Sequence, residues 1–311
     1  MTPFQANALL TLGTNLRQAG YRFMTVTPST HRRINGRPGN EQARDLRDVF
    51  GWSRPFAAAI LPPGMLELMA AAGVLAGEGN ALRSIVRAST LDDLLLFHSA
   101  FPTQADDAVF FGPDTYRFVG AMRRAFASAD PAPMRAVDVG CGSGAGALTV
   151  ARAFPAADVI GADVNTAALA LSRVNARLND VATFTACESD LFAGVEGEVD
   201  LIVSNPPFVV DPDERRYRHG GGDRGAELSR RIVEEGLVRL RPGGRLLLYT
   251  GVALSGIDDH FLDSIRARLD AECASWSYEE LDPDIFGGQL GEAGYEDVER
   301  IAAVWLQARK R

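Results

Sequence analysis

The stretch AVDVGCGSGAGAL, residues 136–148, decides the fold. Its first residues read as a buried strand, and Gly140, Gly142 and Gly144 follow directly. Glycine allows the backbone to turn tightly and to approach a ligand closely, and a helix that begins there offers unpaired N–H groups. The stretch therefore predicts a strand, a cofactor-binding turn and a helix, the unit from which α/β folds are built.

A second strand, DVIGAD at residues 158–163, ends in Asp163 about twenty positions after the glycines, where a carboxylate can accept both ribose hydroxyl protons. From Ala136 onward, short β-branched runs alternate with Ala/Leu/Arg stretches of helical period. We expect a Rossmann-like sheet with helices on both faces. The pattern Gly140-x-Gly142-x-x-Ala145 also fits a relaxed dinucleotide fingerprint. These two strands alone are therefore equally consistent with NAD as the cofactor.

A third strand, DLIVSNPPF at residues 200–208, ends in a proline pair that fixes φ and removes two backbone donors. Acceptors remain, namely the Asn205 carboxamide oxygen and the Pro206 carbonyl. They can take the two protons of a planar –NH2 group and turn the nitrogen lone pair toward an electrophilic methyl group. We expect the catalytic site to consist of Asn205, Pro206, Pro207 and Phe208.

Residues 1–105 lack this alternation and predict a smaller α+β domain, with residues 106–311 as the cofactor-binding domain. The expected elements are helices over 3–19, 41–50 and 63–72, a polar loop over 28–39, and hairpin strands over 82–88 and 94–98. This order is that of a winged helix. The helix over 63–72 carries Glu67 and no Arg or Lys, which favours a packing or substrate-presenting role over nucleic-acid binding.

Composition narrows the function further. Over 311 residues, 32 Lys and Arg against 40 Asp and Glu give a net charge of −8, which disfavours a nucleic-acid partner. We expect no membrane span, because no run approaches the roughly 18 apolar residues that a span needs. We expect no metal site, because Cys141, Cys187 and Cys273 are far apart. The N-terminal residues lack the features of a secretory signal, so a cytoplasmic location is expected.

The order of these motifs resembles that of the class I S-adenosylmethionine-dependent methyltransferases. Among them, the sequence is similar to the release-factor glutamine methyltransferases of the HemK type and to related small-domain N-methyltransferases with an Asn-Pro-Pro-Phe motif. The matching segments are, in chain order, 137–144, 161–165, 188–192, 205–208, 220–225, 231–233 and 241–246.

The resemblance implies a role for each motif residue. The three glycines would approach the methionine part of S-adenosylmethionine, with Asp138 anchoring their loop, and Asp163 would hold the ribose. Asp190 and Leu191 would border the adenine, and Tyr116 would contact the cofactor from a segment that closes over it. The implied cofactor-binding residues are Tyr116, Asp138, Gly140, Gly142, Gly144, Asp163, Asp190, Leu191 and Asn205.

We therefore expect an S-adenosylmethionine-dependent methyltransferase that acts on a planar amide or amino nitrogen, with a protein glutamine as the first candidate. A base amine of RNA or DNA, adenine N6 or guanine N2, is an alternative. A non-catalytic winged-helix ligand sensor is another. The polar, glycine-rich stretch over 211–222 is long enough to act as a mobile flap over an acceptor, which is a protein, a small molecule or a nucleic acid.

Overall fold

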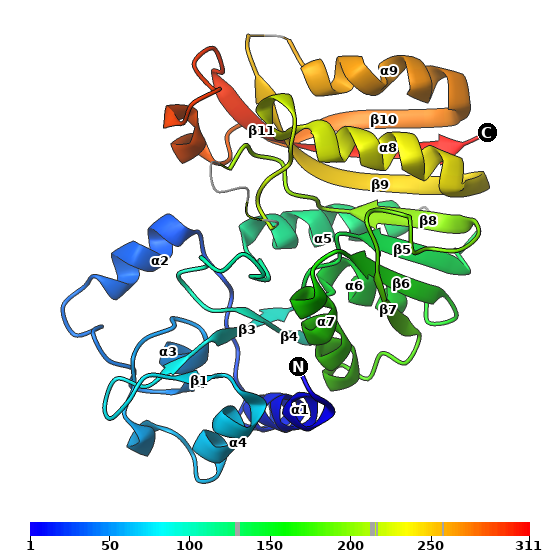
Figure 1. Cartoon of the computed structure of the whole chain (residues 1–311). Coiled ribbons are helices and arrows are strands. Elements are labelled where there is room, and N and C mark those ends of the chain that lie inside the picture. Colours follow the sequence, from blue (N-terminus) through cyan, green and yellow to red (C-terminus); the bar gives the residue numbers. More distant parts are fainter. Residues whose placement is uncertain (128–130, 212–214, 216, 257) are drawn as a thin grey trace. The chain divides into compact units, whose positions relative to one another are not determined.

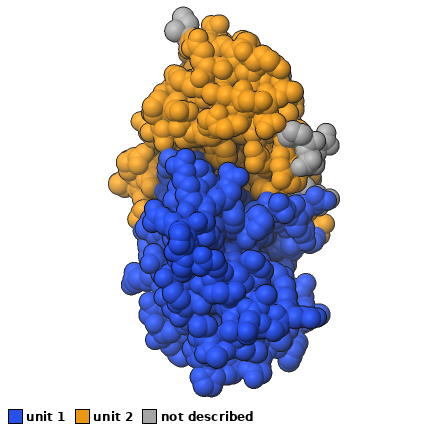
Figure 2. Space-filling view, turned by 90° about the vertical axis from the view of Figure 1, so that its left-hand side faces the viewer, with its two compact units in different colours: residues 1–117, 142–145, 166–182 blue, residues 118–141, 146–165, 183–311 orange. Residues whose placement is uncertain are grey.

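The computed structural model describes residues 1–127, 131–211, 215, 217–256 and 258–311 (Figure 1). Residue contacts divide the chain into two compact units (Figure 2). Unit 1 comprises residues 1–117, 142–145 and 166–182, and unit 2 comprises residues 118–141, 146–165 and 183–311. No helix in the described chain combines the length and the apolar character needed to cross a lipid bilayer.

A seven-stranded sheet forms the centre of the described part of unit 2, in the order β10-β11-β9-β8-β5-β6-β7. The five strands from β9 to β7 in this order run parallel, whereas β10 and β11 are antiparallel to their neighbours. The strands are β5 (Arg135–Val139), β6 (Asp158–Asp163), β7 (Phe184–Glu188), β8 (Val199–Ser204), β9 (Leu240–Leu254), β10 (Cys273–Asp282) and β11 (Arg300–Lys310).

Helices cover both faces of this sheet. On one face, α8 (Glu227–Arg239) and α9 (His260–Glu272) bury residues such as Val233 and Ile265 in one apolar cluster with the strands (Figure 1). On the other face, α5 (Pro113–Phe126) packs through Phe118. The centroid of the Phe118 ring lies 6.4 Å from the ring centroids of Tyr249 and Trp305. The helix α6 (Ala145–Ala153) follows β5, and short 3-10 turns span Asp223–Gly225 and Gly287–Gly291. The predicted Rossmann-like sheet is confirmed.

Unit 1 is built around one apolar cluster that joins α1, α4, the hairpin and α7. The predicted helix over 63–72 and the predicted hairpin are present, and α4 ends at Gly73, whose φ of 69° lies in the left-handed region. The elements are α1 (Pro3–Gln18), α2 (Pro28–Asn35), α3 (Leu46–Phe50), η1 (Ala58–Ile60), α4 (Met65–Ala72), β1 (Leu75–Ala76), β2 (Arg83–Ser84), β3 (Val86–Leu91), β4 (Leu94–Ser99) and α7 (Thr166–Leu178).

Two predicted elements of unit 1 differ in the structure. The expected polar loop over 28–39 contains the helix α2, because the Thr27 hydroxyl accepts the Thr30 N–H and Pro28 suits the first helical position. The expected helix over 41–50 is limited to α3, which begins after Asp45 because the Asp45 carboxylate accepts the Asp48 N–H. Polar composition was the wrong signal in the first case, since a capped proline start outweighs it.

The outer edge of β4 is bound by Asn175 of α7 and by Asn179, which directly follows that helix. Asn179 accepts the Leu95 N–H at 3.0 Å and donates to the Leu95 carbonyl at 2.9 Å, and Asn175 makes the same pair of bonds to Phe97 at 2.8 and 2.9 Å. Four residues of helix rise about 6 Å and two residues of strand rise about 6.8 Å, so the two spacings match. The winged-helix arrangement is not confirmed, because a helix from residues 166–178 binds this edge.

Candidate active site

The glycine-rich loop begins where β5 ends. The Gly140 and Cys141 N–H groups donate to the Ala162 carbonyl at 2.8 and 3.1 Å. Gly140 and Gly142 have φ values of 70° and 52°, and an ideal Cβ at either position would meet no atom within 4 Å. The left-handed backbone conformation favours glycine at both positions, and the open space leaves the backbone accessible to a ligand.

Asp138 braces this loop from inside the fold. Its carboxylate is buried, and Oδ2 accepts the Ala147 N–H at 2.8 Å near the start of α6. A Cβ at Gly146 would lie only 2.7 Å from this oxygen, so the helix approaches the carboxylate as closely as glycine permits. Burial, with a smaller contribution from the Asp163 charge, raises the pKa of Asp138 to about 7, and the Ala147 hydrogen bond acts in the opposite direction.

Asp163 ends β6 and is half-buried. Its Oδ1 accepts the Asn165 N–H at 2.8 Å, which fixes the carboxylate at the strand end, and its carbonyl accepts the Ser189 N–H at 3.1 Å. The next strand, β7, pairs Glu188 with Asp163. The acidic end of β6 is thus tied to the loop that follows β7.

Two predicted residues lie in that loop. Leu191 is buried with a φ of 49°, and its carbonyl accepts the Ser189 hydroxyl at 2.8 Å. Asp190 is exposed, and its carboxylate lies 3.8 Å from the Arg231 guanidinium, a surface pair of small energetic weight. The loop therefore presents a fixed apolar side chain next to an exposed acidic one.

The Asn-Pro-Pro-Phe motif follows β8. Val139 pairs with Ser204 across the parallel β5–β8 ladder, and the Ser204 hydroxyl donates to the Val139 carbonyl at 2.7 Å. The next residues in each strand, Gly140 and Asn205, therefore emerge side by side at one edge of the sheet. Pro206 is buried and Asn205 is half-buried.

Phe208 is held by the fold rather than left in solvent. A Cβ at Gly251 of β9 would lie 2.3 Å from the Phe208 ring, so glycine is needed for this close approach. The ring also meets Phe286 edge-on with 5.3 Å between centroids. These contacts fix the end of the motif in unit 2.

The strand order brings the separate motifs of unit 2 together. The carboxyl ends of β8, β5, β6 and β7 are neighbours in the sheet, and they lead into Asn205, Gly140, Asp163 and Glu188. The chain runs from β5 toward β7 and then returns to the other side with β8. Ligands of open α/β sheets bind at the carboxyl ends of the strands next to such a reversal.

A C-terminal segment that the sequence did not single out holds the backbone just after the motif. The Val210 N–H donates to the Tyr295 hydroxyl at 2.9 Å, and the Gln289 amide donates to the Val210 carbonyl at 2.8 Å. Gln289 and Tyr295 are both buried. No spacing rule links them to Val210, because they follow it by 79 and 85 residues.

The predicted flap over 211–222 is only partly described, since residues 212–214 and 216 lie outside the described chain. The Asp211 carboxylate is buried against the Arg215 and Arg218 guanidinium groups, and the hydrogen bond from Arg215 lowers its pKa. The Asp211 N–H donates to Nδ1 of His219 at 3.2 Å. This imidazole nitrogen is thus occupied by the backbone.

Tyr116 lies in unit 1. Its hydroxyl donates to the Thr90 carbonyl at 3.2 Å and accepts the Thr25 N–H at 3.0 Å. Burial raises the pKa of this phenol. The hydroxyl is therefore neutral at neutral pH and is engaged within unit 1.

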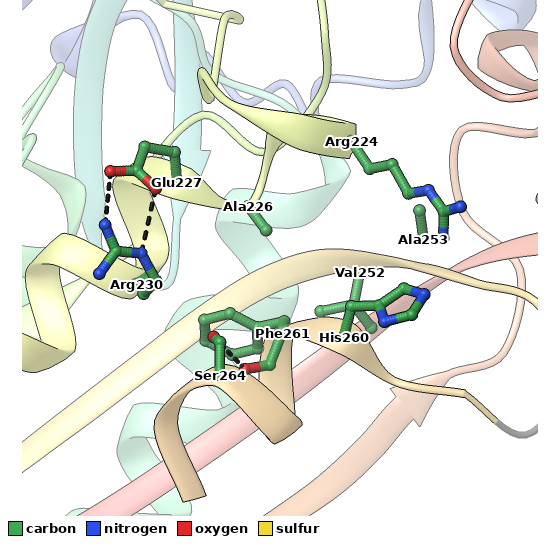
Figure 3. Close-up of a pocket in the computed structure, with 9 residues that line it drawn as sticks. All are labelled: Arg224, Ala226, Glu227, Arg230, Val252, Ala253, His260, Phe261 and Ser264. Atoms are coloured by element: carbon green, nitrogen blue, oxygen red, sulfur yellow. Dashed lines mark hydrogen bonds and ion pairs between the residues drawn. The ribbon is translucent and has the colours of Figure 1, made fainter. Parts of the chain in front are cut away.

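A cavity of about 190 Å³ in unit 2 contains none of the predicted site residues (Figure 3). Glu227 and Arg230, one turn apart on α8, pair with each other through hydrogen bonds of 2.7 and 3.0 Å, so their charges offset each other. The lining residues are Arg224, Ala226, Glu227, Arg230, Val252, Ala253, His260, Phe261 and Ser264.

A family model matches the part of the chain that contains the strand ends described above. Residues 124–255 match the family model described as the methyltransferase small domain. The match includes the glycine-rich loop, Asp163, and the Asn-Pro-Pro-Phe motif.

Curated relatives match part of the chain. A release factor glutamine methyltransferase of Deinococcus radiodurans is 35% identical over 163 residues, which cover 49% of this chain and 55% of that protein. A ribosomal RNA small subunit methyltransferase C of Chromohalobacter salexigens is 39% identical over 126 residues, which cover 40% of this chain and 34% of that protein. The chain spans about half the length of the glutamine methyltransferases that it matches.

Solved methyltransferase structures resemble the chain as well. An S-adenosylmethionine-dependent methyltransferase from Agrobacterium tumefaciens has a TM-score of 0.48 and 16% identity, and the match covers 76% of each chain. A methyltransferase from Pyrococcus furiosus has a TM-score of 0.41 and 22% identity, covering 61% of this chain and 82% of that one.

Proposed function

We propose that the chain is an S-adenosylmethionine-dependent N-methyltransferase that acts on a planar amide or amino nitrogen. One observation carries the proposal. Asn205 and Gly140 follow residues that pair across two adjacent parallel strands, so the amine-binding motif and the cofactor loop share one edge of the sheet. A nicotinamide enzyme needs no such pair of acceptors beside its cofactor loop.

The residues at this edge fit the cofactor. The open space around Gly140 and Gly142 admits the methionine part, and Asp138 braces the loop that would carry it. Asp163, at the next strand end, is the proposed ribose ligand, and Asp190 with Leu191 would border the adenine. Gly144, Asn205 and Tyr116 complete the proposed binding set.

When bound, S-adenosylmethionine supplies an electrophilic methyl group on a positively charged sulfur. The Asn205 carboxamide oxygen and the Pro206 carbonyl accept the two protons of the acceptor nitrogen, which directs its lone pair at the methyl carbon. Pro207 keeps the backbone rigid, and the Phe208 ring packs against the planar acceptor. Methyl transfer would form a nitrogen–carbon bond as the carbon–sulfur bond breaks, and the surplus proton would leave to water.

A protein glutamine is the first candidate acceptor, because several of the matched relatives are named as release factor glutamine methyltransferases. A nucleic-acid base amine is the second, since another matched relative is named as a ribosomal RNA methyltransferase. In either case, residues 1–105 would present the acceptor to residues 106–311.

Calorimetry tests the cofactor. S-adenosylhomocysteine should bind more tightly than NAD, and Asp163→Ala should weaken its binding by about 1–3 kcal/mol. Asp158→Ala is the matched control, because Asp158 begins the same strand at its opposite end. Tighter binding of NAD, or equal losses in both variants, would contradict the proposal.

Transfer of a radiolabelled methyl group to fractionated protein, RNA and small-molecule extract tests the acceptor. Label should enter one fraction with the native chain and be nearly absent with Asn205→Ala. A chain that labels no fraction but binds duplex DNA in a salt-dependent manner would instead be a ligand-sensing regulator.

A further inference from the structure

Unit 1 contains a buried arginine on a polar face of its hairpin. Arg87 of β3 is 4% exposed and lies directly opposite His98 of β4. Ser89, two residues further along β3, shares this face. The opposite face carries Ala88 and Phe97, which belong to the apolar cluster of unit 1. One face of the hairpin therefore packs in the core, and the other gathers polar side chains.

The Arg87 charge has no partner among the described residues. Its Nε donates to the Ser99 carbonyl at 3.3 Å, whereas its two terminal nitrogens form no hydrogen bond or ion pair with any described group. Burial lowers the pKa of Arg87 to about 10, so the group is still charged at neutral pH. A buried charge without a counter-charge is strongly unfavourable.

The titratable groups around Arg87 do not supply a negative charge. Burial raises the pKa of Tyr21 and of Tyr116, so both phenols are neutral. Burial and the Arg87 charge lower the pKa of His31 to about 4 and that of His98 further, so both imidazoles are neutral. The Nδ1 atoms of His31 and His98 are buried without a partner among the described residues.

The hairpin is also joined to the glycine-rich loop within unit 1. Asn175 donates to the Phe97 carbonyl and to the Ser143 carbonyl, each at 2.9 Å. Ser143 lies between two of the predicted cofactor-binding glycines. A ligand on the hairpin is thus connected through one side chain to the backbone of that loop.

We propose that the polar face centred on Arg87 binds an oxyanion, a carboxylate or a phosphate, that belongs to a ligand of the enzyme. The guanidinium offers two terminal nitrogens in the planar arrangement that such anions accept bidentately. The identity of the carrier rests on the proposed function, because the anion is either the cofactor's carboxylate or a group on the acceptor. The anion site itself does not depend on it.

Thermal unfolding of the full chain tests the site with inorganic phosphate as the probe and potassium chloride of equal ionic strength as the blank. Arg87→Met keeps the apolar stem and removes the charge. Without phosphate, its Tm should equal or exceed that of the native chain, because an unpaired buried charge is lost. Phosphate should raise the Tm of the native chain and of the control Arg22→Met, whose arginine is exposed in the same unit. It should not raise that of Arg87→Met.

Two results would overturn the site. One is that Arg87→Met unfolds or loses several degrees of Tm, which would make the charge structural. The other is that phosphate raises the Tm of all three proteins equally. Arg87→Lys retains the charge without the bidentate geometry and should show a reduced phosphate response.

Calorimetry then identifies the carrier by comparing S-adenosylhomocysteine with 5′-methylthioadenosine, which has no carboxylate. If Arg87→Met weakens only the former, by about tenfold or more, the cofactor carries the anion. If both bind within twofold of the native chain while the KM of the acceptor rises, the acceptor carries it. A chain that binds neither nucleoside refutes the proposed function but leaves the phosphate result standing.

Discussion

Asn175→Ala removes the side chain that joins α7, β4 and the glycine-rich loop. The substitution leaves three backbone groups without their partner, namely the Phe97 N–H, the Phe97 carbonyl and the Ser143 carbonyl. Asn175 is fully buried. Each unsatisfied buried group costs about 1–3 kcal/mol, and water entering the vacated space restores part of this. We expect the free energy of unfolding to fall by about 2–4 kcal/mol.

Asn179→Ala is the matched control. Asn179 makes the same two bonds to Leu95 and is equally buried, but it forms no bond to residues 142–145. Asn179 also accepts a hydrogen bond from the Arg17 guanidinium at 2.6 Å, so its loss of stability should be at least as large. The two variants should differ in cofactor binding, because only Asn175 fixes the position of the Ser143 carbonyl. S-adenosylhomocysteine should bind about 3–10-fold more weakly to Asn175→Ala and within about twofold of native affinity to Asn179→Ala.

Urea unfolding followed by far-UV circular dichroism measures the first effect, and isothermal calorimetry measures the second. An unchanged midpoint for Asn175→Ala would refute the energetic argument. Equal losses of cofactor affinity in both variants would refute the specific link to the loop, since a general loosening of unit 1 would then explain the result.

Three further outcomes are expected. Asn205→Ala should keep cofactor affinity within a few fold and lower turnover by roughly 10²–10³, while Asn205→Asp should be milder; near-native turnover in Asn205→Ala would place the chemistry elsewhere. Asp138 keeps its proton up to about pH 7 in the folded chain but loses it near pH 4 in the unfolded chain. The free energy of unfolding should therefore fall as the pH rises between these values, by at most about 1.4 kcal/mol per pH unit. Urea titrations should show that Asp138→Asn lacks this slope, and an identical slope in the variant would exclude Asp138 as its source. Tyr295→Phe frees the Val210 N–H, and steady-state assays should show turnover about tenfold lower with unchanged S-adenosylhomocysteine affinity, whereas equal losses of both would indicate general misfolding.

The Rossmann-like half could be predicted because its signals are local. The glycines, the acidic residue that ends β6 and the proline pair after β8 each lie next to the strand that positions them. Parallel pairing then brings Gly140, Asp163 and Asn205 to one edge without any further information. A short pattern was sufficient because the regular geometry of the sheet supplies the rest.

The remaining features depend on tertiary contacts that local spacing does not encode. Asn175 and Asn179 read as ordinary polar positions of a helix, and nothing nearby shows that they bind a strand almost 80 residues earlier. Gln289 and Tyr295 approach Val210 only after the C-terminal strands have joined the sheet. That no described residue supplies a counter-charge to Arg87 is visible only when the set of its neighbours is known.

The position of α7 also constrains how the protein is made. Ala168, Leu171, Val174 and Leu178 of this helix belong to the apolar cluster of unit 1, and the helix covers the edge of β4. During synthesis, the first 117 residues therefore leave the ribosome without a helix that their core requires. A fragment that ends there exposes an unpaired strand edge, which is a template for aggregation. Grafting this unit onto a different α/β domain requires that residues 166–182 be transferred with it.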